Sequence, residues 1–159
     1  MILQTITDTK QLMSDLLIKD TFHDFLVREV TIVTYCTLHL DGTMLADFYD
    51  NGEYEELGFP ECASWDKLKP LCFSFIKGKK LPLKMQLVFH APQSIVDALL
   101  AGEAAGFAAD DIHSLTFTVK YEKGKATVLS GLSLKIFTID QTLAHAWDCY
   151  VNKLFSPYL

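Results

Sequence analysis

The segment SLTFTVKYEKGKATVLSGLSLKIF, residues 114–137, decides the fold class because it predicts a β-hairpin with one buried face. The odd positions from Leu115 to Tyr121 are apolar, whereas Thr116, Thr118 and Lys120 between them are polar. This alternation is typical of a strand that packs one face on a core. A Glu-Lys-Gly turn follows, and KATVLSGLSLKIF returns the chain.

The rest of the chain predicts further strands and four helices around this hairpin. Strands are expected at MILQTI, VREVTIVTYCTLHL, TMLADFY and LKMQLVFH, with Asp41-Gly42 as the turn between the second and third. Apolar residues at helical spacing predict helices over 8–18, 64–77, 93–102 and 140–155. We therefore expect a single α+β domain over 1–159, with a mainly antiparallel sheet of six or seven strands and helices largely on one face.

The predicted elements occur twice in the same order. A strand, a helix, a long strand, a turn and a return strand span residues 1–50 and again residues 83–137. This is a repeat of architecture without residue identity, so a duplicated strand-helix-strand-strand unit and chance both explain it.

Composition excludes several classes of protein. The chain has 159 residues, a formal charge of -6 and a single arginine, Arg28, which argues against sequence-specific nucleic-acid binding. The start of the sequence predicts no signal peptide, and no segment is long enough to span a membrane. Four cysteines without a CxxC pair predict reduced thiols in a cytoplasmic protein, with Cys36 and Cys72 in the core.

Charged residues segregate along the chain. Residues 41–66 hold eight acids and no Lys or Arg, and residues 67–84 hold six Lys and no acid. One interpretation is two solvated stretches that lie against each other. The other is an anion-binding loop formed by Lys77, Lys79, Lys80 and Lys84.

Polar side chains share one parity on three predicted strands. The residues expected on this sheet face are Tyr35, His39, Gln86, His90, Thr116, Thr118 and Lys120. Such a face can be a ligand platform or the wet surface that antiparallel sheets often have.

The predicted C-terminal helix has an apolar stripe that includes Leu143, Trp147 and Leu154. Trp147 is expected to be buried and Cys149 exposed. His145 and Cys149, four residues apart, could both touch a metal, but no second pair at ligand spacing follows. We predict no metal and no cofactor.

Three segments are informative together: LLIKDTFHDFLVREVTIVTYCTLHLDG, LCFSFIKGKKLPLKMQLVF and SLKIFTIDQTLAHAWD. They resemble a family of small bacterial proteins known only as a domain of unknown function. The resemblance covers nearly the whole chain and implies a bacterial, cytoplasmic, stand-alone domain without assigned catalytic residues. The repeated strand-helix-strand-strand order is also similar to the unit of DNA sliding clamps.

Three functions remain open from the sequence. The first is a non-enzymatic binding or protein-interaction module, with an unidentified protein or small molecule as partner, no membrane contact, and a homodimer as one arrangement. The second is a small enzyme that uses His39, His90 or Cys149 on the polar face. The third is a clamp-like nucleic-acid accessory protein.

Overall fold

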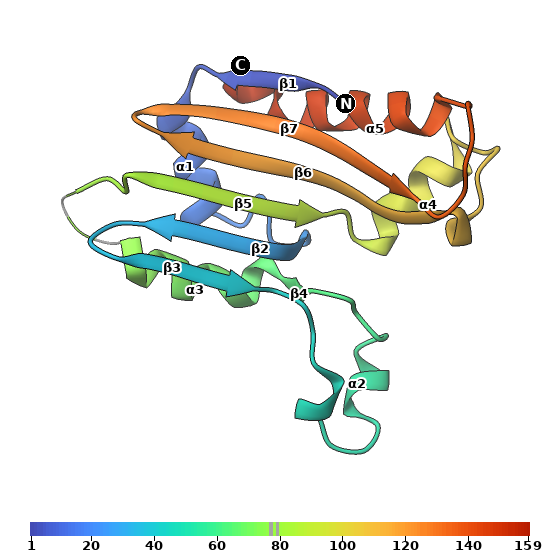
Figure 1. Cartoon of the computed structure of the whole chain (residues 1–159), viewed down its shortest axis with the longest axis horizontal. Coiled ribbons are helices and arrows are strands. Elements are labelled where there is room, and N and C mark those ends of the chain that lie inside the picture. The colour runs from blue at the N-terminus through green and yellow to red at the C-terminus, as the bar shows by residue number, and fades with distance from the viewer. Residues whose placement is uncertain (77, 79) are drawn as a thin grey trace.

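The protein is built on one antiparallel sheet (Figure 1). The structure is a computed structural model that describes residues 1–76, 78 and 80–159. The sheet order is β1-β7-β6-β5-β2-β3, with the short β4 beside β2. The strands are β1 (Leu3–Ile6), β2 (Leu26–Val33), β3 (Thr37–Asp41), β4 (Ala63–Ser64), β5 (Lys84–His90), β6 (Ile112–Glu122) and β7 (Lys125–Leu134).

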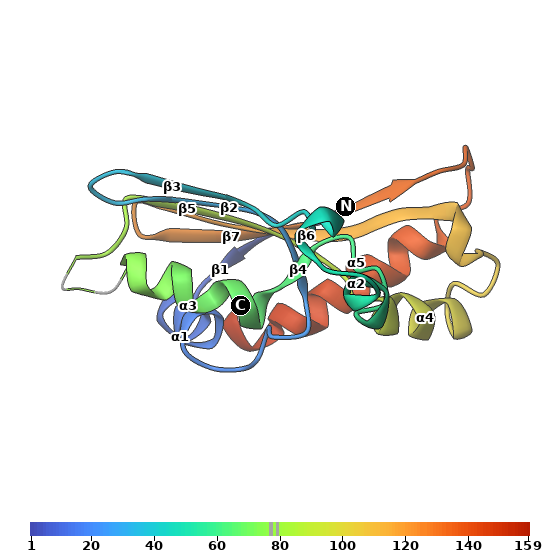
Figure 2. The ribbon, with the colours of Figure 1, turned by 90° about the horizontal axis from the view of Figure 1, so that it is seen from below.

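The four longer helices cover one face of this sheet, as expected for a half-buried antiparallel sheet (Figure 2). They are α1 (Thr9–Leu17), α3 (Trp65–Ile76), α4 (Gln93–Ala101) and α5 (Thr142–Phe155). Their bounds follow the predicted ranges within two residues. The predicted α+β class and the single antiparallel sheet are confirmed.

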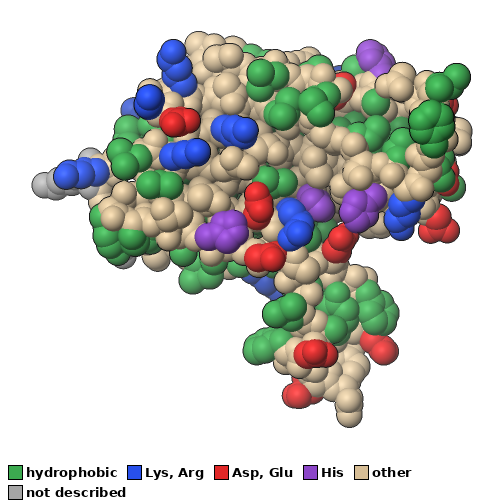
Figure 3. Space-filling model, viewed as in Figure 1, with side chains coloured by type: hydrophobic (Ala, Val, Ile, Leu, Met, Phe, Trp, Pro, Cys, Tyr) green, Lys and Arg blue, Asp and Glu red, His purple; other side chains and the backbone are tan. Residues whose placement is uncertain are grey.

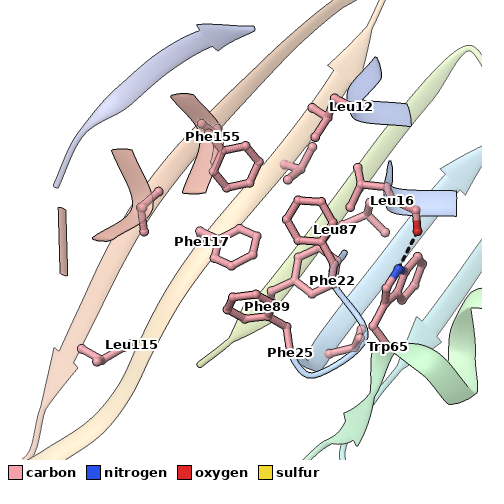
Figure 4. Close-up of a cluster of buried hydrophobic side chains, with 14 of the residues drawn as sticks. Leu12, Leu16, Phe22, Phe25, Trp65, Leu87, Phe89, Leu115, Phe117 and Phe155 are labelled. Carbon is pink, nitrogen blue, oxygen red and sulfur yellow. Dashed lines mark hydrogen bonds between the residues drawn. The ribbon is translucent and has the colours of Figure 1, made fainter. Parts of the chain in front are cut away.

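An aromatic cluster fills the space between the sheet and the helices (Figure 4). Phe22 lies at its centre, with its ring 6.3 Å from that of Phe89 and 5.7 Å from that of Phe155. Trp65 of α3 is fully buried and donates its indole N–H to the carbonyl oxygen of Leu16 at 2.7 Å. This bond satisfies the one polar group of the indole inside the core.

The prediction of a hairpin turn at Asp41-Gly42 is wrong. The chain turns earlier, at residues 34–36, where the Thr34 N–H donates to the Cys36 carbonyl oxygen, and β2 and β3 form a hairpin. Cys36 is therefore exposed in the turn rather than buried in the core, whereas Cys72 is buried as expected. The segment TMLADFY is not a return strand: Ala46–Phe48 form a 3₁₀ turn instead.

Residues 42–62 leave the sheet as a projection, which we call the arm (Figure 1). Its stem is closed by bonds between its two ends, Met44 N–H to the Glu61 carbonyl and Ala63 N–H to the Gly42 carbonyl. A short helix, α2 (Glu53–Glu56), lies at its tip. The Tyr54 hydroxyl donates to the Pro60 carbonyl oxygen at 2.6 Å and fastens the tip to the returning chain.

The repeated element order is present, but the two copies pair differently. Strand, helix and hairpin occur as β1-α1-β2-β3 and again as β5-α4-β6-β7. In the second copy β5 pairs with β6, whereas β1 pairs with β7 and not with β2. The sheet order therefore does not repeat with the element order.

Helix α5 packs its apolar stripe on the sheet. Trp147 is buried and donates its indole N–H to the Thr116 carbonyl oxygen at 2.8 Å. Cys149, expected to be exposed, is half-buried. Asp148 is not simply solvated, because its carboxylate accepts from the buried Ser130 hydroxyl and from the N-terminal amine.

Candidate functional site

The open face of the sheet gathers six of the seven predicted polar residues. The register places Gln86 opposite Lys120, Thr118 opposite Val88, and His90 opposite Thr116. His39 lies on β3 and bonds Thr31 of β2 at 3.0 Å. These side chains lie in rows across four strands, as an uncovered antiparallel face predicts.

Tyr35 does not join this face. It lies in the β2–β3 turn with its ring 6.0 Å from that of Phe75 in α3, so it points toward the helix side. The sequence predicted one long strand through this region, and its alternation placed Tyr35 on the open face. This placement is wrong because β2 ends at Val33, before Tyr35.

Lysines gather at the β6–β7 hairpin end of the open face (Figure 3). Lys84 lies opposite Glu122, which in turn lies opposite Lys125, and Lys120 is one row away. We call Lys84, Lys120, Lys123 and Lys125 the basic end. Of the predicted anion site, Lys84 belongs to this group, Lys80 is exposed just before β5, and Lys77 and Lys79 lie outside the described residues.

The arm carries the net negative charge of the whole protein. Residues 42–62 contain six acids and no Lys or Arg, so the other 138 residues carry 14 basic and 14 acidic side chains. Figure 3 shows acidic and hydrophobic side chains together on the projection. The arm and the basic end are separate regions of the surface, but of the basic end only Lys84 comes from the Lys-rich stretch 67–84 that the sequence singled out.

Aromatic side chains run along the arm beside these acids. The ring of Phe48 lies 5.4 Å from that of Tyr49, Tyr49 lies 5.8 Å from Tyr54, and Tyr54 lies 5.5 Å from Phe59. Phe48 is 84% exposed and Phe59 is 62% exposed. Exposed aromatic groups next to acids provide both apolar contact area and the negative ring faces that attract cations.

Phe59 is held in an unfavourable backbone conformation. Its φ of 53° lies in the left-handed region, which costs a bulky residue of the order of 1–3 kcal/mol. Gly58 before it has φ 81°, where glycine carries no such cost. The closed arm therefore keeps a large apolar side chain exposed at the expense of backbone strain.

A hollow of about 460 Å³ lies between the base of the arm and the end of the sheet. Residues 57–61 of the arm form one wall, and the end of β5, the start of α4 and the start of β6 form the other. Its volume is within the range of small-molecule sites. The polar side chains that line it are His90, His113, Glu61, Gln93 and Ser114.

The electrostatics of the hollow favour a neutral His90. Burial lowers the pKa of His90; the Glu61 carboxylate opposes this change, whereas Arg28 and His113 add to it. Arg28 itself is engaged by the stem of the arm, because its Nη1 donates to Asp41 at 2.9 Å and to Thr43 at 2.6 Å. Glu61 is the one Asp, Glu, Lys or Arg side chain in the lining.

Sequence reasoning found His90 but missed its neighbours in the hollow. His113 reaches it because the β6–β7 register shifts between Ile112 and Ser114. Glu61 and Phe59 reach it because the arm folds back to the sheet at its stem. Neither the register shift nor the return of the arm has a local signal in the sequence.

One cysteine and one histidine side chain lie close together on helix α5. The Cys149 sulfur lies 3.7 Å from the His145 ring nitrogen on the outer side of α5. Within residues 1–76, 78 and 80–159, no group of three or more His, Cys, Asp or Glu side chains is arranged to hold a metal ion. Among the described residues, neither the His90 nor the His113 side chain is hydrogen-bonded to a serine or cysteine side chain.

Similarity to known proteins assigns a family but no activity. The model of DUF5721, a family of unknown function, matches residues 15–158. The chain belongs to the DUF5721 family. No curated protein and no solved structure matches it. The resemblance expected from the three sequence segments is confirmed as a family of unknown function, and DUF5721 membership brings no catalytic or binding residues to this chain.

None of the helices in the described part of the chain has the length and hydrophobicity that crossing a membrane requires.

Proposed function

We propose that the protein is a non-enzymatic interaction module whose contact surface is the arm, and that its partner is a basic segment of another protein. The observation that carries the proposal is the coincidence of charge and aromatic exposure on one projection. The arm concentrates the acids of the chain and exposes Phe48 and Phe59 beside them. Complementary charge steers association, and aromatic anchors supply most of the binding energy at interfaces.

The arm has the rigidity that such a surface needs. Hydrogen bonds join the two ends of the arm at its stem. The Tyr54–Pro60 hydrogen bond and the aromatic ladder, the row of ring contacts from Phe48 to Phe59, hold the tip. A preformed surface loses less conformational freedom on binding than a flexible loop does. A bacterial cytoplasmic location is part of the proposal, supported by the four unpaired thiols, which suit a reducing compartment.

The proposal is tested by titrating a short fluorescein-labelled arginine-serine repeat peptide and following its anisotropy. The arm variant carries Asp50→Asn, Glu53→Gln and Glu55→Gln. The control carries Asp24→Asn, Glu103→Gln and Asp110→Asn, which are exposed acids outside the arm, so both variants have the same net charge. We expect the arm variant to bind about tenfold more weakly than the wild type and the control to stay within about twofold.

Equal loss in the two variants would mean that binding follows net charge alone, and the proposal would then fail. A Phe48→Ala variant separates aromatic contact from charge, because it leaves the charge unchanged. We expect it to weaken binding, whereas Phe137→Ala, at a residue that is 96% exposed in the β7–α5 loop, should not.

A second candidate is the clamp-like nucleic-acid accessory protein, which the basic end favours. Lysines from β5, β6 and the β6–β7 turn meet there on the uncovered sheet face. Duplex DNA binding that falls steeply with salt, and that Lys84→Gln with Lys120→Gln abolishes, is the expected result for this role. DNA binding that does not respond to salt would exclude it.

A further inference from the structure

We propose that the hollow at the base of the arm is a subsite for a single arginine side chain of the basic partner. This inference rests on the proposed function and goes beyond it, because it assigns one side chain to one hollow. Three features of the hollow support it: its position, its lining and its charge.

The position of the hollow makes it continuous with the arm surface. Leu57 through Glu61 line the hollow and also end the arm, and Phe59 belongs both to this lining and to the aromatic ladder. A peptide that lies along the rings from Phe48 to Phe59 would therefore arrive at the mouth of the hollow.

The lining suits a long side chain with an apolar stem and a polar head. Leu26, Val96 and Leu115 provide an apolar surface for methylene groups. The polar groups that could meet the head are the Glu61 carboxylate, the imidazoles of His90 and His113, and the oxygens of Gln93 and Ser114. These are mostly acceptors, and a neutral imidazole offers one acceptor nitrogen and a flat ring face.

The charge of the hollow distinguishes arginine from other occupants. Glu61 gives the lining a negative charge, and the other five acids of the arm lie on the same projection. Arg28 is already paired with Asp41, so it does not supply a free cation for an anionic ligand. Arginine fits better than lysine because its planar fork presents five donors to several acceptors and stacks on aromatic rings.

The test uses N-acetyl-arginine amide as a probe and backbone amide chemical shifts of the full chain as the readout. We expect saturable shifts at His90, His113 and Ser114, with a Kd on the order of 1 mM, as suits a fragment of this size. N-acetyl-citrulline amide has nearly the same shape without the charge and should not produce them. Glu61→Gln should weaken the arginine probe about tenfold, whereas the matched change Glu56→Gln at the arm tip should not.

Two outcomes would overturn the inference: citrulline amide shifting the same residues as strongly, or arginine amide leaving the hollow unshifted. The result is distinguishable from that of the peptide titration. If the repeat peptide depends on the arm acids while the arginine probe leaves the hollow unshifted, the interaction module stands and the subsite falls. If the arginine probe fills the hollow while neutralising the arm acids leaves peptide binding unchanged, the subsite stands and the arm as partner surface falls.

Discussion

Gly42 is the residue on which the attachment of the arm depends, and Gly42→Ala tests this directly. A Cβ at this position would lie 1.8 Å from the carbonyl oxygen of Val27 and 2.8 Å from its carbonyl carbon. Both atoms belong to the backbone of β2, so no side chain can rotate away. Either β2 moves, or the stem separates from it.

The cost of the two routes can be compared. Moving β2 displaces the fully buried Val27, and overpacking of this kind costs about 1–3 kcal/mol. Separating the stem breaks the bonds from Gly42 N–H to the Arg28 carbonyl and from Ala63 N–H to the Gly42 carbonyl. At about 0.5–1.5 kcal/mol for each bond, this route costs about 1–3 kcal/mol. We therefore expect Gly42→Ala to lower the free energy of unfolding by about 2 kcal/mol.

Urea denaturation measures this loss, with Gly106→Ala as the matched control. A Cβ at Gly106 meets only the Asp140 carboxylate, at 4.0 Å, so the control should stay within about 0.5 kcal/mol of the wild type. Peptide binding should weaken in Gly42→Ala because the arm loses its anchor. Equal stability of the two variants would refute the account of the stem.

Three further predictions concern the core and the titrating groups. Trp147→Ala should lower the free energy of unfolding by about 3–5 kcal/mol in urea, whereas Cys149→Ser should cost much less; a larger loss for Cys149→Ser would contradict the packing of α5. Burial lowers the pKa of His90 in the folded protein below 6.5. As the pH falls, His90 is therefore protonated more readily in the unfolded chain than in the folded protein, so the free energy of unfolding decreases below about pH 6.5. His90→Gln should lose less stability than the wild type between about pH 7.5 and about pH 5.5, and equal losses would refute this. Burial raises the pKa of the Cys72 thiol to about 12, so a thiol-specific reagent should modify the exposed Cys36 in the native protein and Cys72 only after unfolding; the opposite order would show that the β2–β3 turn is misplaced.

The regular elements could be predicted because their patterns are local. The alternation from Leu115 to Tyr121 and the helical spacing around Trp147 each determine which side chains are buried. The same reasoning failed at the β2–β3 hairpin. Thr34, Tyr35 and Cys36 form the turn without a Gly, Pro or Asn signal, while Asp41-Gly42 has a turn signature that the protein uses for a close approach to β2.

The candidate site was predicted only in part because long-range contacts form it. Parity predicted that His90, Thr116 and Lys120 lie on one sheet face, and the register agrees with this, with Thr116 opposite His90 and Lys120 opposite Gln86. The hollow also needs Glu61 and Phe59 from the arm, which return to the sheet only through the stem bonds. Acidic composition indicated an unusual segment, but composition alone does not show that it projects from the sheet.

The central claim is that the arm binds a basic partner, and chemical-shift mapping of the full chain with the arginine-serine repeat peptide tests it most directly. The account predicts saturable shifts concentrated in residues 45–61, extending to His90 and His113, and lost in the variant with Asp50→Asn, Glu53→Gln and Glu55→Gln. Shifts spread over exposed acids elsewhere, such as Asp24, Glu103 and Asp110, or unchanged shifts in the arm variant, would contradict it.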